Sequence, residues 1–159
     1  KLPAIKRFLE KCKRDATQDK VISNPYGRRR RVRRHINHWG KLSGRGERIS
    51  QNFPIQSMGA EIIKIAIIKI YELIVKPNIY GDKYQFMNTI HDEVNSSVEK
   101  SIVREVSFEL GKAMRQMIPG KPIPIVTDLE IGNNMGLLWK FDQDPDTLEI
   151  TPVMEPQDD

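Results

Sequence analysis

The sequence predicts an α+β fold in which helices alternate with hairpins of a largely antiparallel sheet. Apolar residues recur at helical intervals in residues 2–20 and again in residues 102–117. Between these stretches, Tyr84, Phe86 and Ile90 alternate with polar residues, which is the period of a half-buried strand. Helices and hairpins in this order are typical of the α+β class, and 159 residues fit one ordinary domain.

Residues 1–45 are expected to form a helix, a hairpin and a loop. The helix over residues 2–20 begins near Pro3 and has a basic face opposite its apolar one. Residues 21–22 then form a short strand, and turn residues lead into an arginine-rich second arm. Residues 35–45 show no clear period, so we expect a loop there.

The middle of the chain predicts two helical segments. Arg48, Asn52 and Gln56 recur every four residues, which places them on one face of a helix. Pro54 lacks an N–H donor and disfavours helical geometry at the residue before it, so we expect the helix to end or kink there. Residues 59–76 are apolar almost all round, which predicts a helix buried on most sides and ended by Pro77.

The alternating pattern then predicts a hairpin over residues 84–98 with an acidic tip, followed by a second long helix. Ser96 and Glu99 have the spacing of a capping box. The apolar stripe of this helix ends before Pro119. It consists of Ile102, Val103, Val106, Leu110, Met114 and Met117. We expect the two methionines to fill the core.

The last part of the chain predicts only strands. Residues 125–131 read as one strand after the extended segment Pro122–Pro124. Residues 137–141 and 148–151 are expected to form a final hairpin around a turn at residues 143–146.

Charge is distributed unevenly along this basic chain, whose net charge is +5 and whose pI is about 9.4. Residues 28–34 hold six arginines in seven positions, whereas the residues after Lys140 carry acids and no base. The arginine run is therefore the candidate for nucleic-acid binding, although a solvated face is the simpler interpretation of such a run.

Cys12 is the single cysteine, which excludes an internal disulfide and a thiolate metal cluster and favours a reducing cytosol. The apolar stretch over residues 62–75 is interrupted by charges and too short for a bilayer, so no membrane partner is expected. A first residue of lysine suggests a chain that begins inside a longer product.

The tripeptide His91-Asp92-Glu93 is the strongest chemical signal. A carboxylate at a hairpin tip suits Mg²⁺, which takes one or two carboxylates together with substrate phosphates. The alternative is an acidic pair on an ordinary solvated turn.

Upstream residues favour the metal interpretation. The segment from Gly46 to Lys64, followed by an apolar stretch and then His91-Asp92-Glu93, resembles the C-terminal palm portion of family A DNA polymerases. The resemblance runs from about Leu2 to Trp139. Residues 56–60, Gln-Ser-Met-Gly-Ala, are more similar to the phage replicative branch than to bacterial repair enzymes, which have Gly-Thr-Ala there.

The resemblance implies a polymerase palm-like antiparallel sheet packed on long helices. Asp92 would reach two Mg²⁺ ions that activate the primer 3′-hydroxyl and hold the triphosphate of the incoming dNTP, with Glu93 assisting. His91 would contact the primer terminus. Glu93 also favours DNA synthesis over RNA synthesis, because single-subunit RNA polymerases usually lack this glutamate.

Primer-template DNA is the implied macromolecular ligand. Arg48, Asn52 and Gln56 would meet minor-groove acceptors that every base pair presents, unless they are ordinary surface residues. Lys64 either meets phosphate or extends from a buried helix to solvent. We assign phosphate contacts to four arginines of the basic run, namely Arg28, Arg29, Arg30 and Arg31. For Tyr26, Trp39 and Tyr80 we expect packing rather than base stacking.

The family also needs a second catalytic aspartate, fingers and a thumb, which these residues do not supply. We therefore expect a fragment or subunit of a DNA-directed DNA polymerase that is inactive alone and works in a bacterial or phage-infected cytosol with a polypeptide carrying those parts. The expected divisions are a basic N-terminal segment (1–47), the palm (48–141) and an acidic tail (142–159). The alternatives are a non-catalytic basic nucleic-acid-binding module and a metal-dependent nuclease.

Overall fold

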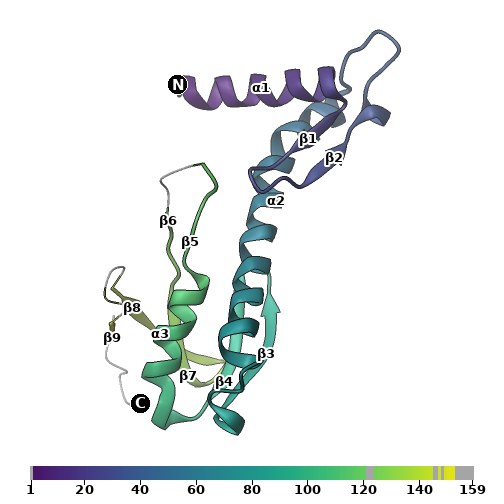
Figure 1. Ribbon diagram of the computed structural model, residues 1–159. Coiled ribbons are helices and arrows are strands. Elements are labelled where there is room, and N and C mark those ends of the chain that lie inside the picture. Colours follow the sequence, from purple (N-terminus) through teal and green to yellow (C-terminus); the bar gives the residue numbers. More distant parts are fainter. Residues whose placement is uncertain (1, 121–123, 145–146, 148, 153–159) are drawn as a thin grey trace. The chain divides into compact units, whose positions relative to one another are not determined.

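The structure, a computed structural model, describes residues 2–120, 124–144, 147 and 149–152, and it divides the chain into two units, residues 1–61 and 62–159 (Figure 1). The unit boundary falls inside the longest helix, α2 (Gly44–Ile70). Helices and antiparallel strands alternate along the chain, so the α+β prediction is confirmed. No helix among the described residues is both long and apolar enough to cross a membrane.

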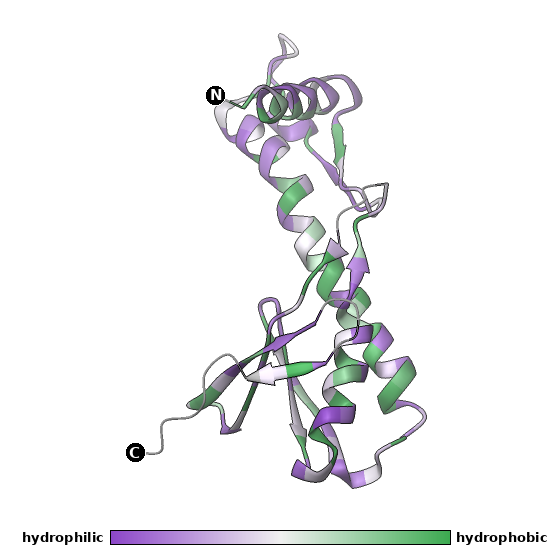
Figure 2. Ribbon diagram, turned by 90° about the vertical axis from the view of Figure 1, so that its left-hand side faces the viewer, coloured by the Kyte–Doolittle hydropathy of each residue, from purple (hydrophilic) through white to green (hydrophobic). Residues whose placement is uncertain are grey.

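The first unit consists of α1 (Pro3–Asp19), the hairpin β1 (Val21–Ser23) and β2 (Arg29–Arg31), a 3₁₀ turn at Arg33–His35, and the first part of α2. Ala16, Ile22 and Val32 are fully or nearly fully buried at its centre. Leu42, Ile49 and Phe53 pack around them. The hairpin thus lies on α2, and most residues of α1 are hydrophilic (Figure 2).

The second unit builds its core around the end of α2 and the π-helical turn that continues it, Tyr71–Val75. Ile70, Ile74, Tyr84, Val106 and Ala113 are its buried residues. They come from α2, that turn, β3 (Tyr84–Ile90) and α3 (Val103–Met114). Strand β4 (Glu93–Val98) pairs with β3, and short 3₁₀ turns at Gly81–Lys83 and Lys100–Ile102 flank the hairpin.

The remaining strands form two further antiparallel sheets, β5 (Gln116–Met117) with β6 (Pro124–Ile125), and β7 (Leu129–Asn134) with β8 (Leu137–Gln143) and β9 (Ile150–Pro152). The final hairpin is therefore confirmed. The predicted single strand over 125–131 is wrong, because residue 125 pairs with β5 while Leu129 pairs with β8. Residues 121–123, the turn residues 145–146, Leu148 and the tail beyond residue 152 lie outside the described residues.

Pro54 neither ends α2 nor divides it, contrary to the sequence prediction. A proline inside a helix costs about 3 kcal/mol because the carbonyl four residues earlier loses its donor. Here Pro54 itself is buried, and Ile49 and Phe53 pack on the core just before it. Packing on the core therefore maintains the helical path across the missing hydrogen bond.

The apolar helix after Pro54 is not buried on most sides. Ile68, Tyr71 and Leu73 are 45–55% exposed, whereas Ile70 and Ile74 are buried. The reason is that β3, β4 and α3 cover one side of this segment, and the described part of the chain supplies no second layer for these three side chains.

Two helix-boundary predictions are also wrong. Ser96 lies within β4, where its hydroxyl is 3.1 Å from the Tyr84 hydroxyl, so it does not cap a helix. Helix α3 ends at Met114 rather than near Pro119, because Gln116 turns into β5 and donates to the Ile62 carbonyl at 2.8 Å. Met117 consequently is 57% exposed and does not fill the core.

Candidate functional site

Helix α2 begins at Gly44, within the segment expected to be a loop. The Ser43 hydroxyl accepts a hydrogen bond from the Gly46 amide at 3.1 Å, and the Ser43 carbonyl accepts one from Glu47 at 2.9 Å. This is the arrangement of an N-cap, in which a side-chain oxygen satisfies one of the free N–H groups of the first turn. The cap extends the helix so that Arg45 stands on the same helix as Arg48.

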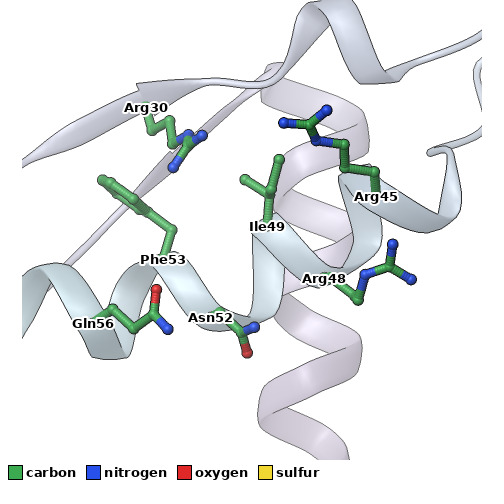
Figure 3. Close-up of a pocket in the computed structure, with 7 residues that line it drawn as sticks. All are labelled: Arg30, Arg45, Arg48, Ile49, Asn52, Phe53 and Gln56. Atoms are coloured by element: carbon green, nitrogen blue, oxygen red, sulfur yellow. The ribbon is translucent and has the colours of Figure 1, made fainter.

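The structure brings Arg48, Asn52 and Gln56 together on one edge of α2, as their spacing predicts (Figure 3). All three side chains are exposed. Because α2 continues through Pro54, the interval of four residues stays helical from Arg48 to Gln56. Their donor groups are therefore available to a ligand along about two turns of helix.

A pocket of about 340 Å³ adjoins this edge. Ile49 and Phe53 supply its apolar lining, and Arg30 stands with its guanidinium 5.8 Å from the centroid of the Phe53 ring (Figure 3). The full lining is Arg30, Arg45, Arg48, Ile49, Asn52, Phe53 and Gln56. Three of these seven residues are cationic and none is acidic, so the pocket favours an anionic ligand.

Strand geometry separates the arginines that the sequence groups together. Arg30 pairs with the buried Ile22, and residue 32, two positions further along the strand, is also buried. Side chains alternate along a strand, so Arg30 lies on the α2-facing side while Arg29 and Arg31 lie on the other. Arg28 differs again, because its guanidinium forms an ion pair with Glu61.

Asn24 fixes this hairpin to the helix. It is 5% exposed, and its Oδ1 accepts hydrogen bonds from the amides of Tyr26 and Arg28 at 3.0 and 2.9 Å. Its Nδ2 donates to the Ser57 hydroxyl at 3.0 Å, and that hydroxyl donates to the Phe53 carbonyl at 2.6 Å. One buried amide therefore joins the turn of the basic hairpin to the part of α2 that lines the pocket.

The acidic tripeptide lies where the sequence predicts, at the tip of the β3–β4 hairpin. Ile90 pairs with Glu93, so His91 and Asp92 form a two-residue turn and Glu93 begins β4. All three side chains are exposed. His91 has a φ of 55°, a left-handed value that is uncommon for residues other than glycine.

The base of this hairpin is rigidly held. The Tyr84 ring is buried in the core of the second unit, and burial raises the pKa of its phenol above the ordinary value despite the hydrogen bond with Ser96. Near the middle, the Asn95 amide donates to Asn88 Oδ1 at 3.1 Å. Asp92 is thus carried on a supported element and still reaches solvent.

The carboxylates of Asp92 and Glu93 at this tip could bind Mg²⁺ only together with ligands from elsewhere. Within the described ranges, no group of three or more histidine, cysteine or acidic side chains could hold a metal ion. One or two carboxylates are nevertheless the usual protein contribution to Mg²⁺ that also binds phosphates. Asp92 and Glu93 supply that number of oxygen ligands.

Three residues of the pocket were not predicted from the sequence, namely Arg45, Ile49 and Phe53. Arg30 was predicted, but only as one of four arginines with the same role. The register of the β1–β2 hairpin would have separated Arg30 from Arg29 and Arg31. Ser43, a preferred N-cap residue, was the available signal for Arg45. The pocket belongs to the first unit and the acidic turn to the second.

Comparison with known proteins identifies the family. Residues 1–137 match the family model of DNA polymerase family A, which is most of the chain. The chain belongs to DNA polymerase family A. The stretch matched within this family includes α2 and the β3–β4 hairpin with its acidic turn.

Curated relatives and a solved structure agree with membership of family A. DNA polymerase I of Caldicellulosiruptor bescii is 28% identical over 135 residues, and that of Streptococcus pneumoniae is 27% identical over 139 residues. These alignments cover 83% and 87% of this chain but 15% of each relative. The chain therefore spans about one seventh of the length of these family A relatives.

The solved structure is the POL domain of Pol1 from M. smegmatis in complex with DNA primer-template and dNTP. It is 26% identical and superposes with a TM-score of 0.57 over 67% of this chain and 18% of that one. The fold of this chain is accordingly that of part of a family A polymerase domain, which agrees with the predicted palm-like α+β class.

Proposed function

We propose that this chain is the C-terminal palm portion of a DNA-directed DNA polymerase and contributes one metal-binding carboxylate, Asp92, to nucleotidyl transfer. The observation that carries the proposal is an exposed aspartate at a two-residue hairpin turn in a chain of family A. A non-catalytic basic module would have no need of a carboxylate on a supported hairpin.

Asp92 would hold Mg²⁺ through its carboxylate, with Glu93 beside it. Bound Mg²⁺ lowers the pKa of an attacking hydroxyl and neutralises the phosphates of a nucleotide. The β3–β4 hairpin would fix the position of the Asp92 carboxylate, because the turn is anchored by the paired strands on either side. His91 would contact the primer terminus.

A second carboxylate ligand, the fingers and the thumb would come from polymerase sequence outside these 159 residues, in the same polypeptide or in a partner. We therefore expect no activity from this chain alone. The same proposal includes the predicted divisions at residues 47/48 and 141/142. It also includes the phage-type character of residues 56–60 and a cytosolic site of action.

Primer-template DNA and an incoming dNTP are the proposed ligands, and the similar M. smegmatis domain, which was solved with both, supports this choice. Arg48, Asn52 and Gln56 would donate to the minor-groove acceptors of the primer-template duplex. Arg30 and Arg45 add positive charge beside them. Arg29 and Arg31 would contact phosphates, whereas the ion pair with Glu61 makes Arg28 a weaker candidate.

Primer extension tests the proposal. The chain is combined with the missing polymerase segments, and Asp92→Asn is compared with Asp82→Asn, which changes an exposed aspartate in the turn before β3. We expect Asp92→Asn to lower the extension rate by about 10²–10³-fold or more, a loss typical of removing one group that stabilises transition-state charge. Asp82→Asn should extend normally. Equal rates for Asp92→Asn and the parent would remove the metal assignment.

The nuclease alternative is tested with the same proteins. Labelled primer-template is incubated with Mg²⁺ but without nucleotides. The polymerase proposal expects no shortening that depends on Asp92, whereas a nuclease that uses Asp92 and Glu93 would shorten the DNA and lose this activity in Asp92→Asn.

A further inference from the structure

A small closed loop at residues 37–41 presents a tryptophan at its tip in the first unit. The Asn37 amide donates to the Lys41 carbonyl at 2.9 Å, and the Gly40 amide donates to the Asn37 carbonyl at 3.0 Å. Asn37 Oδ1 also accepts hydrogen bonds from the amides of Trp39 and Lys41 at 3.0 and 2.9 Å. These four bonds within five residues give the tip one defined shape.

The loop is tied to the start of α2. Ile36 and Leu42 form a β-bridge directly below the tip, and the Ser43 amide donates to the His35 carbonyl at 2.8 Å. A Cβ placed on Gly46 would lie 2.7 Å from His35 Cβ, so helix and loop are in close contact. The tip is therefore a fixed extension of the first unit.

Trp39 is 76% exposed at this tip, so the expectation that it packs against the protein is not met. Its ring lies against the exposed imidazole of His38, with ring centroids 4.5 Å apart and the planes at 45°. Tryptophan has one of the largest apolar surfaces of any side chain, so exposing most of it on an ordered loop costs free energy that a bound ligand would recover.

The surroundings of Trp39 are basic. Residues 33–46 include Arg33, Arg34, Lys41 and Arg45, all exposed, and contain no aspartate or glutamate. Four cations with no acid among them favour a polyanionic ligand by charge complementarity. Aromatic rings combined with positive charge are the usual means of binding single-stranded nucleic acid, since bases stack on the rings and phosphates meet the cations.

We propose that Trp39 is a stacking site for an unpaired base of single-stranded nucleic acid, with the basic residues of segment 33–46 holding the adjacent phosphates. The site goes beyond the proposed function, because it uses neither Asp92 nor the Arg48/Asn52/Gln56 edge. Stacking requires a free base face, which a blunt duplex offers only at its two ends, so the site favours unpaired nucleotides over duplex.

The test measures binding of the full chain to a fluorescent oligothymidine of about twelve nucleotides, and to a blunt duplex of similar length, by anisotropy. Trp39→Ala should weaken single-strand binding by about 5- to 150-fold, which is the range for losing one stacked base. Trp39→Phe should retain most of the affinity. Trp139→Phe, which changes the half-buried second tryptophan in β8, should bind like the parent. Duplex binding should be the same for all four proteins.

Tryptophan emission gives a second readout. In Trp139→Phe the single remaining tryptophan is Trp39, and its emission should fall as oligothymidine saturates the chain. Unchanged emission, or equal single-strand affinity of Trp39→Ala and the parent, would overturn the proposal. If Trp39→Ala weakened duplex binding as much as single-strand binding, the role of Trp39 would be structural. A self-association that Trp39→Ala abolishes, with oligothymidine binding unaffected, would assign the tip to a second copy of the chain instead.

Discussion

His91 combines backbone strain with a position next to the candidate metal ligand. Of the two turn residues, only His91 has a positive φ, and turns with that pattern favour glycine at this position. Non-glycine residues in the left-handed region cost about 1 kcal/mol or more and cluster at functional sites, although they also occur at helix ends such as Lys20. The strain at His91 is therefore consistent with a side chain that is kept for contact with substrate.

His91→Gly should separate stability from activity. We expect the free energy of unfolding to rise by about 0.5–1 kcal/mol, because relief of strain exceeds the added flexibility of the unfolded chain. Primer extension in the completed polymerase should fall, since the imidazole is lost. The matched control is Lys20→Gly, which changes the left-handed residue after α1 and should stabilise without affecting extension. A His91→Gly variant with full activity would assign His91 to turn geometry alone.

Tyr84 makes the stability of the second unit sensitive to alkaline pH. Burial raises the pKa of its phenol in the folded state above the unfolded value of about 10. A raised folded pKa means that the stabilising contribution is fully present below the unfolded pKa and is lost as the pH rises through the folded pKa. The loss is therefore expected above about pH 10.

Tyr84→Phe should flatten this alkaline decline, because phenylalanine keeps the ring in the core and has no proton to lose. Urea unfolding measured from about pH 8 to about pH 11 tests it, since each pH gives a free energy of unfolding. Tyr71→Phe, at a 53% exposed position on the neighbouring helical turn, is the control and should follow the parent. A Tyr84→Phe curve parallel to the parent throughout would contradict the assignment.

At the scale of elements, the contact between the β1–β2 hairpin and α2 depends on Asn24. Asn24→Ala removes a buried amide that makes three hydrogen bonds and leaves two backbone amides without their acceptor. We expect a loss of about 2–4 kcal/mol of unfolding free energy, together with weaker duplex binding because Arg30 is no longer held beside Phe53. Ser57→Ala keeps both turn bonds of Asn24 and removes the hydroxyl that bonds to Asn24 and to the Phe53 carbonyl, so it should cost less, about 1–2 kcal/mol.

The comparison of these two variants locates the effect. If both variants lost the same free energy of unfolding, the two turn bonds of Asn24 would contribute nothing to stability, and the contribution of Asn24 would come from its bond to Ser57. Unchanged duplex binding in a folded Asn24→Ala variant would show that Arg30 takes no part in the site.

Elements with a strong local period were predictable from the sequence. Helix α1, the β3–β4 hairpin and the β8–β9 pair are found where their patterns place them, because each buries one face. The capping-box prediction failed for Ser96 because strand pairing places it opposite Phe86, with its hydroxyl beside that of Tyr84, twelve positions away in the sequence. The predicted break at Pro54 is absent because contacts with the core of the first unit outweigh the free-energy cost of the missing backbone hydrogen bond.

The candidate site shows the same division. Arg48, Asn52 and Gln56 were predictable because helical spacing alone places them on one edge. Arg30 was not separable from Arg29 and Arg31, because the choice of face depends on which residue of β1 pairs with which residue of β2. The ion pair between Arg28 and Glu61 could not be predicted either, since Glu61 is thirty-three residues away in the sequence.

At the scale of the whole molecule, the two units carry different chemistry. The first holds the arginine run, the pocket and the Trp39 tip, all suited to a polyanion. The second holds the acidic turn on a buried hairpin base. A chain that covers about 15% of its family A relatives thus contains one basic surface and one carboxylate tip, each built within its own unit.

The metal assignment depends on whether a divalent ion binds at Asp92 when the chain is assembled with the remaining polymerase segments, primer-template and dNTP. To locate that ion, Fe²⁺ replaces Mg²⁺, and radicals produced at the bound iron cleave the nearby backbone. We expect cleavage at residues 91–93 that excess Mg²⁺ suppresses and that Asp92→Ala abolishes, with Asp82→Ala cleaved like the parent. Cleavage that avoids residues 91–93, or that persists in Asp92→Ala, would contradict the assignment.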